Sequence, residues 1–249
     1  MPVRVRPEAP IINKLMKLFT NGCSFTWGGQ IIENNFNLPS YKFRYDNLDS
    51  DYNKFRKENI WPYHLHNLLQ SDELINLSIG AGSNHRIVRT TYDFFLEKVK
   101  NKENLDDYIA IIQWTDISRY EIFDQDVNDF LLIHSYNIFP EVPGHKKELY
   151  NYKFFCHPKT FESEYKIHLI SLYNFFKNNN IKYLFCTLQP FEITDDYIAS
   201  MNWLGPNPKD NQILNTENFR YDSGHPDLMG HKIISKRLHK RLKELYNIN

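Results

Sequence analysis

Hydrophobic residues along the chain gather in four short runs, each followed by polar or glycine-containing sequence. The runs cover residues 17–20, 74–77, 108–113 and 181–187. The third run begins the segment YIAIIQW and is almost continuously apolar, as expected of a strand buried on both faces of a parallel sheet. The four runs therefore predict parallel β-strands.

Between these runs the apolar residues follow the spacing of helices. Val88, Tyr92, Phe95 and Val99 keep a 4-3-4 spacing, which places them on one helix face. Similar spacing recurs in two later segments, in Phe161, Tyr165, Leu169, Leu172 and Phe176 and then in Ile234, Leu238, Leu242 and Leu245. Strands that alternate with helices predict an α/β protein, a three-layer α/β/α sandwich with a central parallel sheet.

Two segments lack a clear period, residues 30–57 and 117–158. Long irregular segments in a compact domain are either functional loops and lids or small decorating elements. Since neither a repeat nor a linker divides the chain, we expect one domain over residues 1–249 with these two insertions. Ligands of open parallel sheets bind beyond the carboxyl ends of the strands, which directs attention to the segments that follow the four runs.

Composition narrows the class of partner. The chain has 249 residues, enough for one large α/β domain, with 30 Lys and Arg against 30 Asp and Glu. A formal net charge of zero gives no strong field to attract nucleic acid or an anionic membrane surface. We therefore expect no nucleic-acid partner and a small-molecule substrate.

The cysteines and the N-terminal segment indicate the cellular compartment. Cys23, Cys156 and Cys186 are odd in number and widely spaced, which fits neither a disulfide framework nor a zinc-ligand pair. The opening segment MPVRVRPEAP is not followed by the apolar stretch of a secretion signal, and no segment approaches the length of a membrane span. These features predict a cytoplasmic protein in a reducing compartment.

The segment GCSFTWG, residues 22–28, places Ser24 in a glycine-bounded turn directly after the first predicted strand. Such a serine is either a turn residue or a nucleophile presented at the tip of a strand. A serine nucleophile needs a base within hydrogen-bond reach, so the second possibility depends on a histidine elsewhere in the chain.

The best candidate base lies in DSGHPD, residues 222–227, just before the last predicted helix. Asp222 and His225 are three residues apart, and Gly224 permits the tight bend that would bring both into one loop. Asp227 is a plausible N-cap of the final helix. A metal site made of Asp222, His225, Asp227 and His231 is less favoured, since no shared helix face presents both histidines.

Together, GCSFTWG after the first strand and Asp-x-x-His-Pro before the last helix resemble the SGNH/GDSL hydrolase family. The resemblance implies the flavodoxin-like SGNH hydrolase fold. It also implies that Ser24 is the nucleophile, His225 the general base and Asp222 the acid that orients His225. It implies no cofactor and no metal.

The middle of the chain departs from this family. In INLSIGAGSNHRI the backbone donor of the oxyanion hole falls on Ala81 or Gly82, beside the N–H of Ser24. The segment IIQWTDISRYE lacks the family's Gly-x-Asn-Asp, and its Asp116 would repel an oxyanion when ionised. Candidates for the missing side-chain donor are Asn84, Gln113 and the Thr115 hydroxyl.

These observations predict a serine hydrolase that cleaves a carboxylic ester through an acyl-enzyme. An O-acetyl group on a carbohydrate is preferred to a lipid ester, because no long apolar lid is evident. Two alternatives stay open, a catalytically silent binding or virion-associated module that retains the fold, and an acyltransferase that uses the same triad. Arg86 and Arg119 are candidates to bind a substrate anion, although arginines are more commonly solvated at the surface.

Overall fold

A four-stranded parallel sheet forms the centre of the protein. The computed structural model describes residues 15–36, 51–125, 128–133, 158–188, 195–205, 211–213, 219–222 and 224–248. The strands are β1 (Lys17–Asn21), β2 (Glu73–Asn76), β3 (Tyr108–Trp114) and β6 (Lys182–Thr187), in the order β2-β1-β3-β6 with every neighbouring pair parallel. The four predicted strands are therefore confirmed, with ends that differ by one residue.

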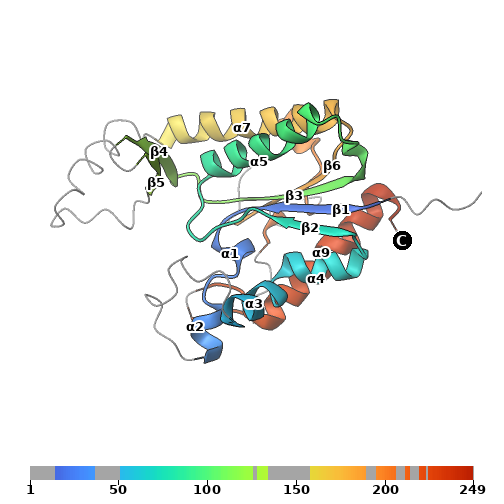
Figure 1. Ribbon diagram of the computed structural model, residues 1–249. Helices are drawn as coiled ribbons and strands as arrows, with labels where there is room; N and C mark the ends of the chain where they lie inside the picture. Colours follow the sequence, from blue (N-terminus) through green and yellow to red (C-terminus); the bar gives the residue numbers. More distant parts are fainter. Residues whose placement is uncertain are drawn as a thin grey trace, which may run out of the picture.

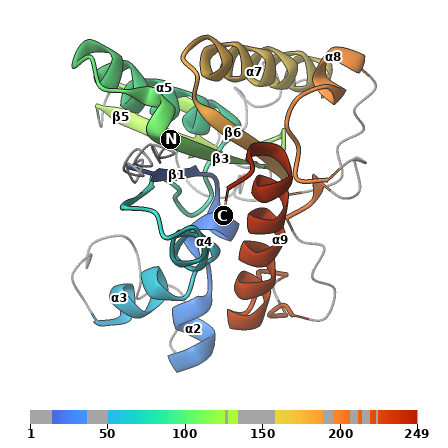
Figure 2. The same ribbon diagram turned by 90° about the vertical axis from the view of Figure 1, so that its right-hand side faces the viewer.

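Helices cover both faces of this sheet (Figure 1). One face carries α5 (Asn84–Lys100) and α7 (Pro158–Asn178), and the other carries α4 (Trp61–Leu69) and α9 (Leu228–Tyr246). The turned view shows the same two layers on either side of the strands (Figure 2). The predicted α/β sandwich, with its parallel sheet between two helical layers, is confirmed.

Successive side chains along each strand point to opposite faces of the sheet, so the strands contribute to two core clusters, one under each helical layer. In β1, Leu18 belongs to the cluster under α4 and α9, whereas Phe19 belongs to the cluster under α5 and α7. In β3, Ile109 and Ile111 face the first cluster, and Ala110, Ile112 and Trp114 face the second. The central strands β1 and β3 are thus buried on both faces, which explains the almost uninterrupted apolar run of β3, whereas the edge strand β2 is only partly buried.

The predicted helix faces are confirmed for α7 and α9, and on α5 for three of the four positions: Phe95 is buried, and Val88 and Tyr92 are partly buried against the same core cluster. Val99 is 41% exposed, and the buried positions of α5 are Asn84, Ile87, Thr91 and Phe95. Two of these four are polar, and both have hydrogen-bond partners: the Thr91 hydroxyl, for example, accepts from Asn21 Nδ2 at 3.0 Å. Because hydrogen-bonded polar groups share the buried stripe with Ile87 and Phe95, apolar spacing alone identified only part of it.

Smaller elements occupy the two segments that lack a clear period. The first contains α2 (Ile31–Phe36) and most of α3 (Asp51–Glu58), and the second contains the antiparallel hairpin of β4 (Tyr120–Asp124) and β5 (Asp129–Ile133). Residues 37–50 and 134–157, with Cys156, lie outside the described residues. The remaining short elements are α1 (Ser24–Trp27), η2 (Leu105–Asp107) and α8 (Asp196–Ala199).

In the part of the chain that the structure describes, no helix combines the length and the apolar character needed to cross a bilayer. Cys23 and Cys186 are both buried and unpaired with another cysteine.

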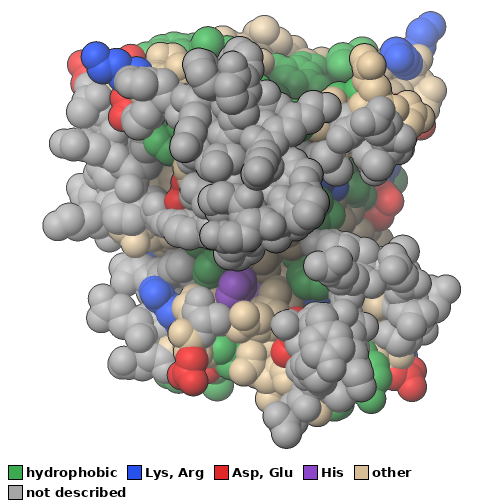
Figure 3. Space-filling view, turned by 90° about the vertical axis from the view of Figure 1, so that its left-hand side faces the viewer, with side chains coloured by type: hydrophobic (Ala, Val, Ile, Leu, Met, Phe, Trp, Pro, Cys, Tyr) green, Lys and Arg blue, Asp and Glu red, His purple; other side chains and the backbone are tan. Residues whose placement is uncertain are grey.

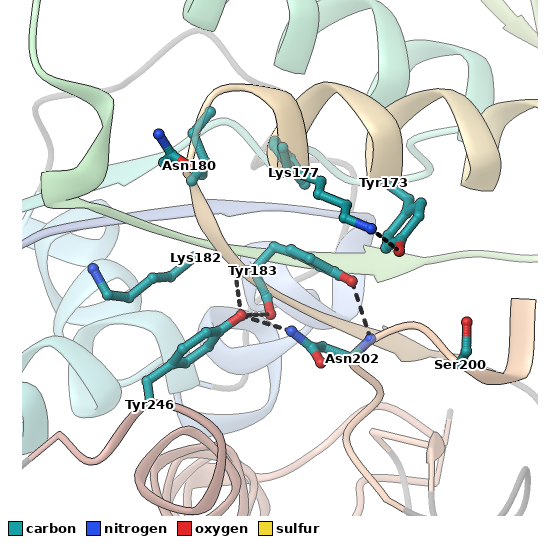
Figure 4. Close-up of a pocket in the computed structure, with 10 residues that line it drawn as sticks. Tyr173, Lys177, Asn180, Lys182, Tyr183, Ser200, Asn202 and Tyr246 are labelled. Carbon is teal, nitrogen blue, oxygen red and sulfur yellow. Dashed lines mark hydrogen bonds between the residues drawn. The ribbon is translucent and has the colours of Figure 1, made fainter.

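A cavity of about 370 Å³ lies where β6 begins, at the amino-end edge of the sheet (Figure 4). Its wall includes Tyr183, Asn202 and Tyr246, whose polar groups satisfy one another. The Tyr246 hydroxyl donates to the Tyr183 carbonyl at 2.8 Å and accepts from the Tyr183 N–H at 2.9 Å and from Asn202 Nδ2 at 2.8 Å. These contacts join the end of α9 to β6 and are fully explained as structural bonds.

Candidate active site

Ser24 lies at the carboxyl end of β1, which has a neighbouring strand on each side. The chain reverses tightly around it. The N–H groups of Thr26 and Trp27 donate to the Cys23 carbonyl at 3.0 Å, and those of Gly28 and Gly29 donate to the Ser24 carbonyl at 2.9 and 2.7 Å. This single helical turn holds the Ser24 side chain at the strand tip, while the N–H of Ser24 has no bond to any described residue.

His225 reaches Ser24 from the other end of the chain. Its Nε2 lies 3.0 Å from Ser24 Oγ, across 201 residues of sequence. The loop is tight, because the Tyr221 N–H donates to the His225 carbonyl at 2.9 Å and Gly224 takes a φ of +83°. Asp227 caps α9 as predicted, with its Oδ1 accepting from the Gly230 N–H at 2.7 Å.

Two neighbours fix the imidazole of His225. The Phe25 ring stacks on it, with centroids 4.3 Å apart and planes at 14°. A Cβ added to Gly29 would lie 3.0 Å from both Cδ2 and Nε2 of His225 and 3.1 Å from Ser24 Cβ. Neither neighbour was predicted from the sequence: the second glycine of Gly28-Gly29 was an available signal, whereas nothing in the sequence marks Phe25 as a stacking partner.

Burial keeps His225 neutral. Removal from water lowers the pKa of His225 to about 4, and the positive charge of the Arg119 guanidinium acts in the same direction. A neutral imidazole at pH 7 has a free lone pair on one ring nitrogen, so Nε2 can accept the proton of the Ser24 hydroxyl. Figure 3 shows this carboxyl-end edge of the sheet, where a histidine side chain reaches the surface in a hollow beside apolar side chains.

Asp222 lies in the same turn as His225, but the structure does not bring the two side chains together. Its side chain is exposed, and among the described residues no hydrogen bond joins its carboxylate to the imidazole. The part of Asp222 as the orienting acid therefore stays a prediction.

The loop after β2 lies against the Ser24 turn. A Cβ added to Gly82 would lie 3.1 Å from the Gly22 carbonyl oxygen and 3.6 Å from Cys23 Cα. The Gly82 N–H donates to the Ile79 carbonyl at 3.4 Å, whereas the Ala81 N–H bonds to no described residue, and Ala81 takes a φ of +63°. Of the two predicted backbone donors, Ala81 is thus the one with an open N–H.

The amides of Asn84 and Gln113 are engaged within the protein. Asn84 Nδ2 donates to the Thr115 carbonyl at 3.1 Å, and Asn84 Oδ1 accepts from the Thr115 N–H at 2.9 Å. These two bonds join α5 to the end of β3. Gln113 lies under the Ser24 turn, where its Oε1 accepts from the Cys23 N–H and from the Thr26 hydroxyl, both at 3.1 Å. The Thr115 hydroxyl is buried and has no hydrogen-bond partner in the described part of the chain.

The four residues weighed as a metal site have other surroundings. His231 is fully buried in α9, and its Nδ1 accepts from the Trp61 N–H at 3.2 Å. Burial lowers the pKa of His231 to about 3, so this imidazole stays neutral. Within the described ranges, no three His, Cys, Asp or Glu side chains gather in a way that could hold a metal ion.

Three solved structures align with more than nine tenths of the chain. A Desulfitobacterium hafniense DCB-2 protein assigned to the G-D-S-L lipolytic family shows 13% identity over 91% of this chain and 99% of its own, with a TM-score of 0.42. TesA shows 12% identity over 92% of this chain and 99% of its own, with a TM-score of 0.43. The psychrotrophic esterase EstA from Pseudoalteromonas sp., inhibited by monoethylphosphonate, shows 13% identity over 93% of this chain and 98% of its own, with a TM-score of 0.44.

A search among curated proteins finds no match. A model of one protein family, described as a family of unknown function (DUF6071), matches residues 44–227 of the chain. The matched segment contains β2, β3, β6 and the His225 loop, while Ser24 precedes it. The chain is a member of the DUF6071 family.

Proposed function

We propose that this protein is a serine hydrolase that cleaves a carboxylic ester. The proposal rests on one observation, the 3.0 Å separation of Ser24 Oγ and His225 Nε2 at the carboxyl edge of the parallel sheet. A nucleophile and a base within hydrogen-bond reach are the arrangement that nucleophilic catalysis requires. The neutral state of His225, and the likeness of both motifs to the SGNH/GDSL family, support the same conclusion.

In the proposed reaction, His225 Nε2 takes the proton of Ser24 as Oγ attacks the ester carbonyl. The N–H groups of Ser24 and Ala81 receive the oxyanion, since neither has a partner among the described residues. His225 then returns its proton to the leaving alcohol, and an acyl group stays on Oγ. Water, activated by the same imidazole, releases the acid and restores Ser24.

Asp222 is the proposed acid that orients His225. Its carboxylate is exposed, so it would act from the solvent side of the turn. Charge-assisted hydrogen bonds at exposed positions contribute less than buried ones. We therefore assign Asp222 a smaller share of the rate than Ser24 or His225.

The proposed substrate is an acylated carbohydrate with a short acyl group, such as an O-acetyl sugar. Comparing p-nitrophenyl acetate with p-nitrophenyl palmitate tests the length of the acyl group. Acetyl-xylose as substrate tests the carbohydrate, with released acetate as the readout. Product analysis with added sugar acceptors separates hydrolysis from acyl transfer.

The direct test is the kinetics of p-nitrophenyl acetate cleavage by wild type, Ser24→Ala and His225→Ala. We expect Ser24→Ala to abolish turnover and His225→Ala to lower kcat/KM by about 10²- to 10⁴-fold, the usual contribution of a general base. Ser200→Ala is a matched control, because Ser200 is exposed at the opposite edge of the sheet. Ser24→Ala protein that folds and cleaves the ester as fast as wild type contradicts the proposal.

A further inference from the structure

Arg119 has an unusual environment for an arginine of this protein. It lies on the loop between β3 and β4, at the carboxyl-end edge of the sheet where Ser24 lies. Its Nη1 is buried and has no hydrogen-bond partner among the residues that the structure describes. None of the ion pairs among the described residues includes Arg119, and the Asp116 carboxylate on the same loop accepts from the Ser118 N–H instead.

Other arginines in the described part of the chain bond to the protein through their guanidinium groups. They are Arg56 with the Trp27 carbonyl, Arg86 with Leu77, Arg89 with Glu121, Arg237 with Gln212 and Arg241 with Trp203. A buried polar atom without a partner is destabilising, and more so when the group is charged. The open N–H of Arg119 is therefore a position that a ligand oxygen would stabilise.

The positive charge of Arg119 acts on His225, the base of the reacting pair. It is one of the two causes that lower the pKa of His225, so the guanidinium lies close enough to the imidazole to be felt by it. In the proposed reaction this imidazole hands its proton to the leaving alcohol, which must then lie beside His225. The oxyanion, in contrast, is bound by the backbone N–H groups of Ser24 and Ala81. Arg119 is therefore placed to meet the alcohol portion of the substrate.

We propose that Arg119 binds an anionic group on the alcohol portion of the substrate, so that the natural substrate is an ester of an acidic alcohol, such as a carbohydrate that carries a carboxylate or a sulfate. Guanidinium groups bind such oxyanions through parallel charge-assisted hydrogen bonds. This inference rests on the proposed hydrolase activity and adds the charge of its substrate.

Three aryl acetates of one shape test the inference: 4-acetoxybenzoate, 4-acetoxybenzenesulfonate and the neutral 4-acetoxybenzamide. We expect wild type to prefer an anionic ester, and the two anions show whether the site favours carboxylate or sulfonate. Arg119→Gln should lower the ratio of kcat/KM for the preferred anion to kcat/KM for the amide by about 10- to 100-fold, mainly through KM. Arg119→Lys should retain part of the preference, since it keeps the charge. Lys240→Gln, which removes an exposed cation from α9, should leave the ratio unchanged.

Binding without turnover separates this inference from the hydrolase proposal. Isothermal titration of 4-hydroxybenzoate and 4-hydroxybenzamide into Ser24→Ala protein should show tighter binding of the anion. Adding Arg119→Gln should remove most of that difference, whereas adding Arg119→Lys should retain part of it. Equal binding of the two compounds overturns the inference, whatever the esterase assays show. An equal loss of kcat on all three esters in Arg119→Gln also overturns it, because it assigns the guanidinium to the oxyanion.

Discussion

Replacing Gln113 by leucine removes the acceptor that holds the Ser24 turn from below. Gln113 is fully buried, and its Oε1 accepts from the Cys23 N–H and the Thr26 hydroxyl at 3.1 Å and from Cys23 Sγ at 3.2 Å. Its Nε2 donates to the Trp114 carbonyl at 2.7 Å. Leucine has a similar size and satisfies none of these groups.

The magnitude follows from the groups left unpaired. Leucine at position 113 orphans the N–H of Cys23 and the hydroxyl of Thr26, at about 1–3 kcal/mol for each buried group, whereas the Trp114 carbonyl keeps the N–H of Leu188 as a donor at 2.9 Å. Since local relaxation recovers part of this, we expect the free energy of unfolding to fall by about 2–5 kcal/mol, a large part of a typical domain stability. Because the turn also positions Ser24, kcat/KM should fall by about 10- to 100-fold.

Urea denaturation followed by tryptophan fluorescence measures the first effect, and p-nitrophenyl acetate cleavage measures the second. Thr26→Val is the matched control, since it removes one donor, keeps the shape and leaves Gln113 its bond to the Cys23 N–H. We expect that control to cost about 1 kcal/mol. A Gln113→Leu protein no less stable than Thr26→Val refutes the reasoning. A large loss of kcat without loss of stability instead assigns Gln113 to the oxyanion.

Three further predictions concern His225. Gly29→Ala places a Cβ 3.0 Å from the imidazole, so kcat/KM should fall at least about tenfold while the free energy of unfolding in urea changes by less than about 1 kcal/mol; unchanged activity would show that the ring has room to move. Asp222→Asn should lower kcat/KM by about tenfold, since its carboxylate is exposed; a loss below twofold would remove Asp222 from the mechanism. The pH profile of kcat/KM should rise through about pH 4 and then level, because His225 is the base only when neutral; an inflection at or above 6.5 would contradict its desolvated environment.

Acidic pH should also lower the free energy of unfolding. The pKa of buried His225 is lowered to about 4 and that of His168 to about 4, both from an ordinary 6.5. Below pH 6.5 the unfolded chain therefore binds more protons than the folded one, and stability falls as the pH is lowered through that window. Circular dichroism at each pH of the kinetic profile separates loss of the fold from protonation of the base.

Apolar patterning was enough to predict the sheet and both helical layers. The strand β3 is buried along its whole length, so its sequence carries few polar residues, and α7 buries every position that its spacing selected. On α5 the pattern missed two buried positions, Asn84 and Thr91, because they are polar. Their burial depends on partners 31 and 70 residues away, Thr115 and Asn21, which hydrophobicity does not encode.

The candidate site was predictable to a lesser extent. Two short motifs identified Ser24 and His225, because a nucleophile and a base need particular residue types in particular loops. The partners of an amide were not predictable: Gln113, weighed as an oxyanion donor, uses its amide to bind the Ser24 turn and the Trp114 carbonyl. The burial of Arg119 was also not predictable: arginines are mostly solvated, yet Arg119 has a buried nitrogen, and its charge acts on His225.

The most direct test of the central claim is covalent labelling by a fluorophosphonate, which reacts with a serine hydroxyl only when a base activates it. We predict one adduct by intact-mass spectrometry, located by peptide mapping on the segment that contains Ser24, absent in Ser24→Ala and strongly slowed in His225→Ala. Labelling of another residue, or no labelling of folded wild-type protein between pH 5 and 9, would contradict the claim that Ser24 and His225 form a reactive pair.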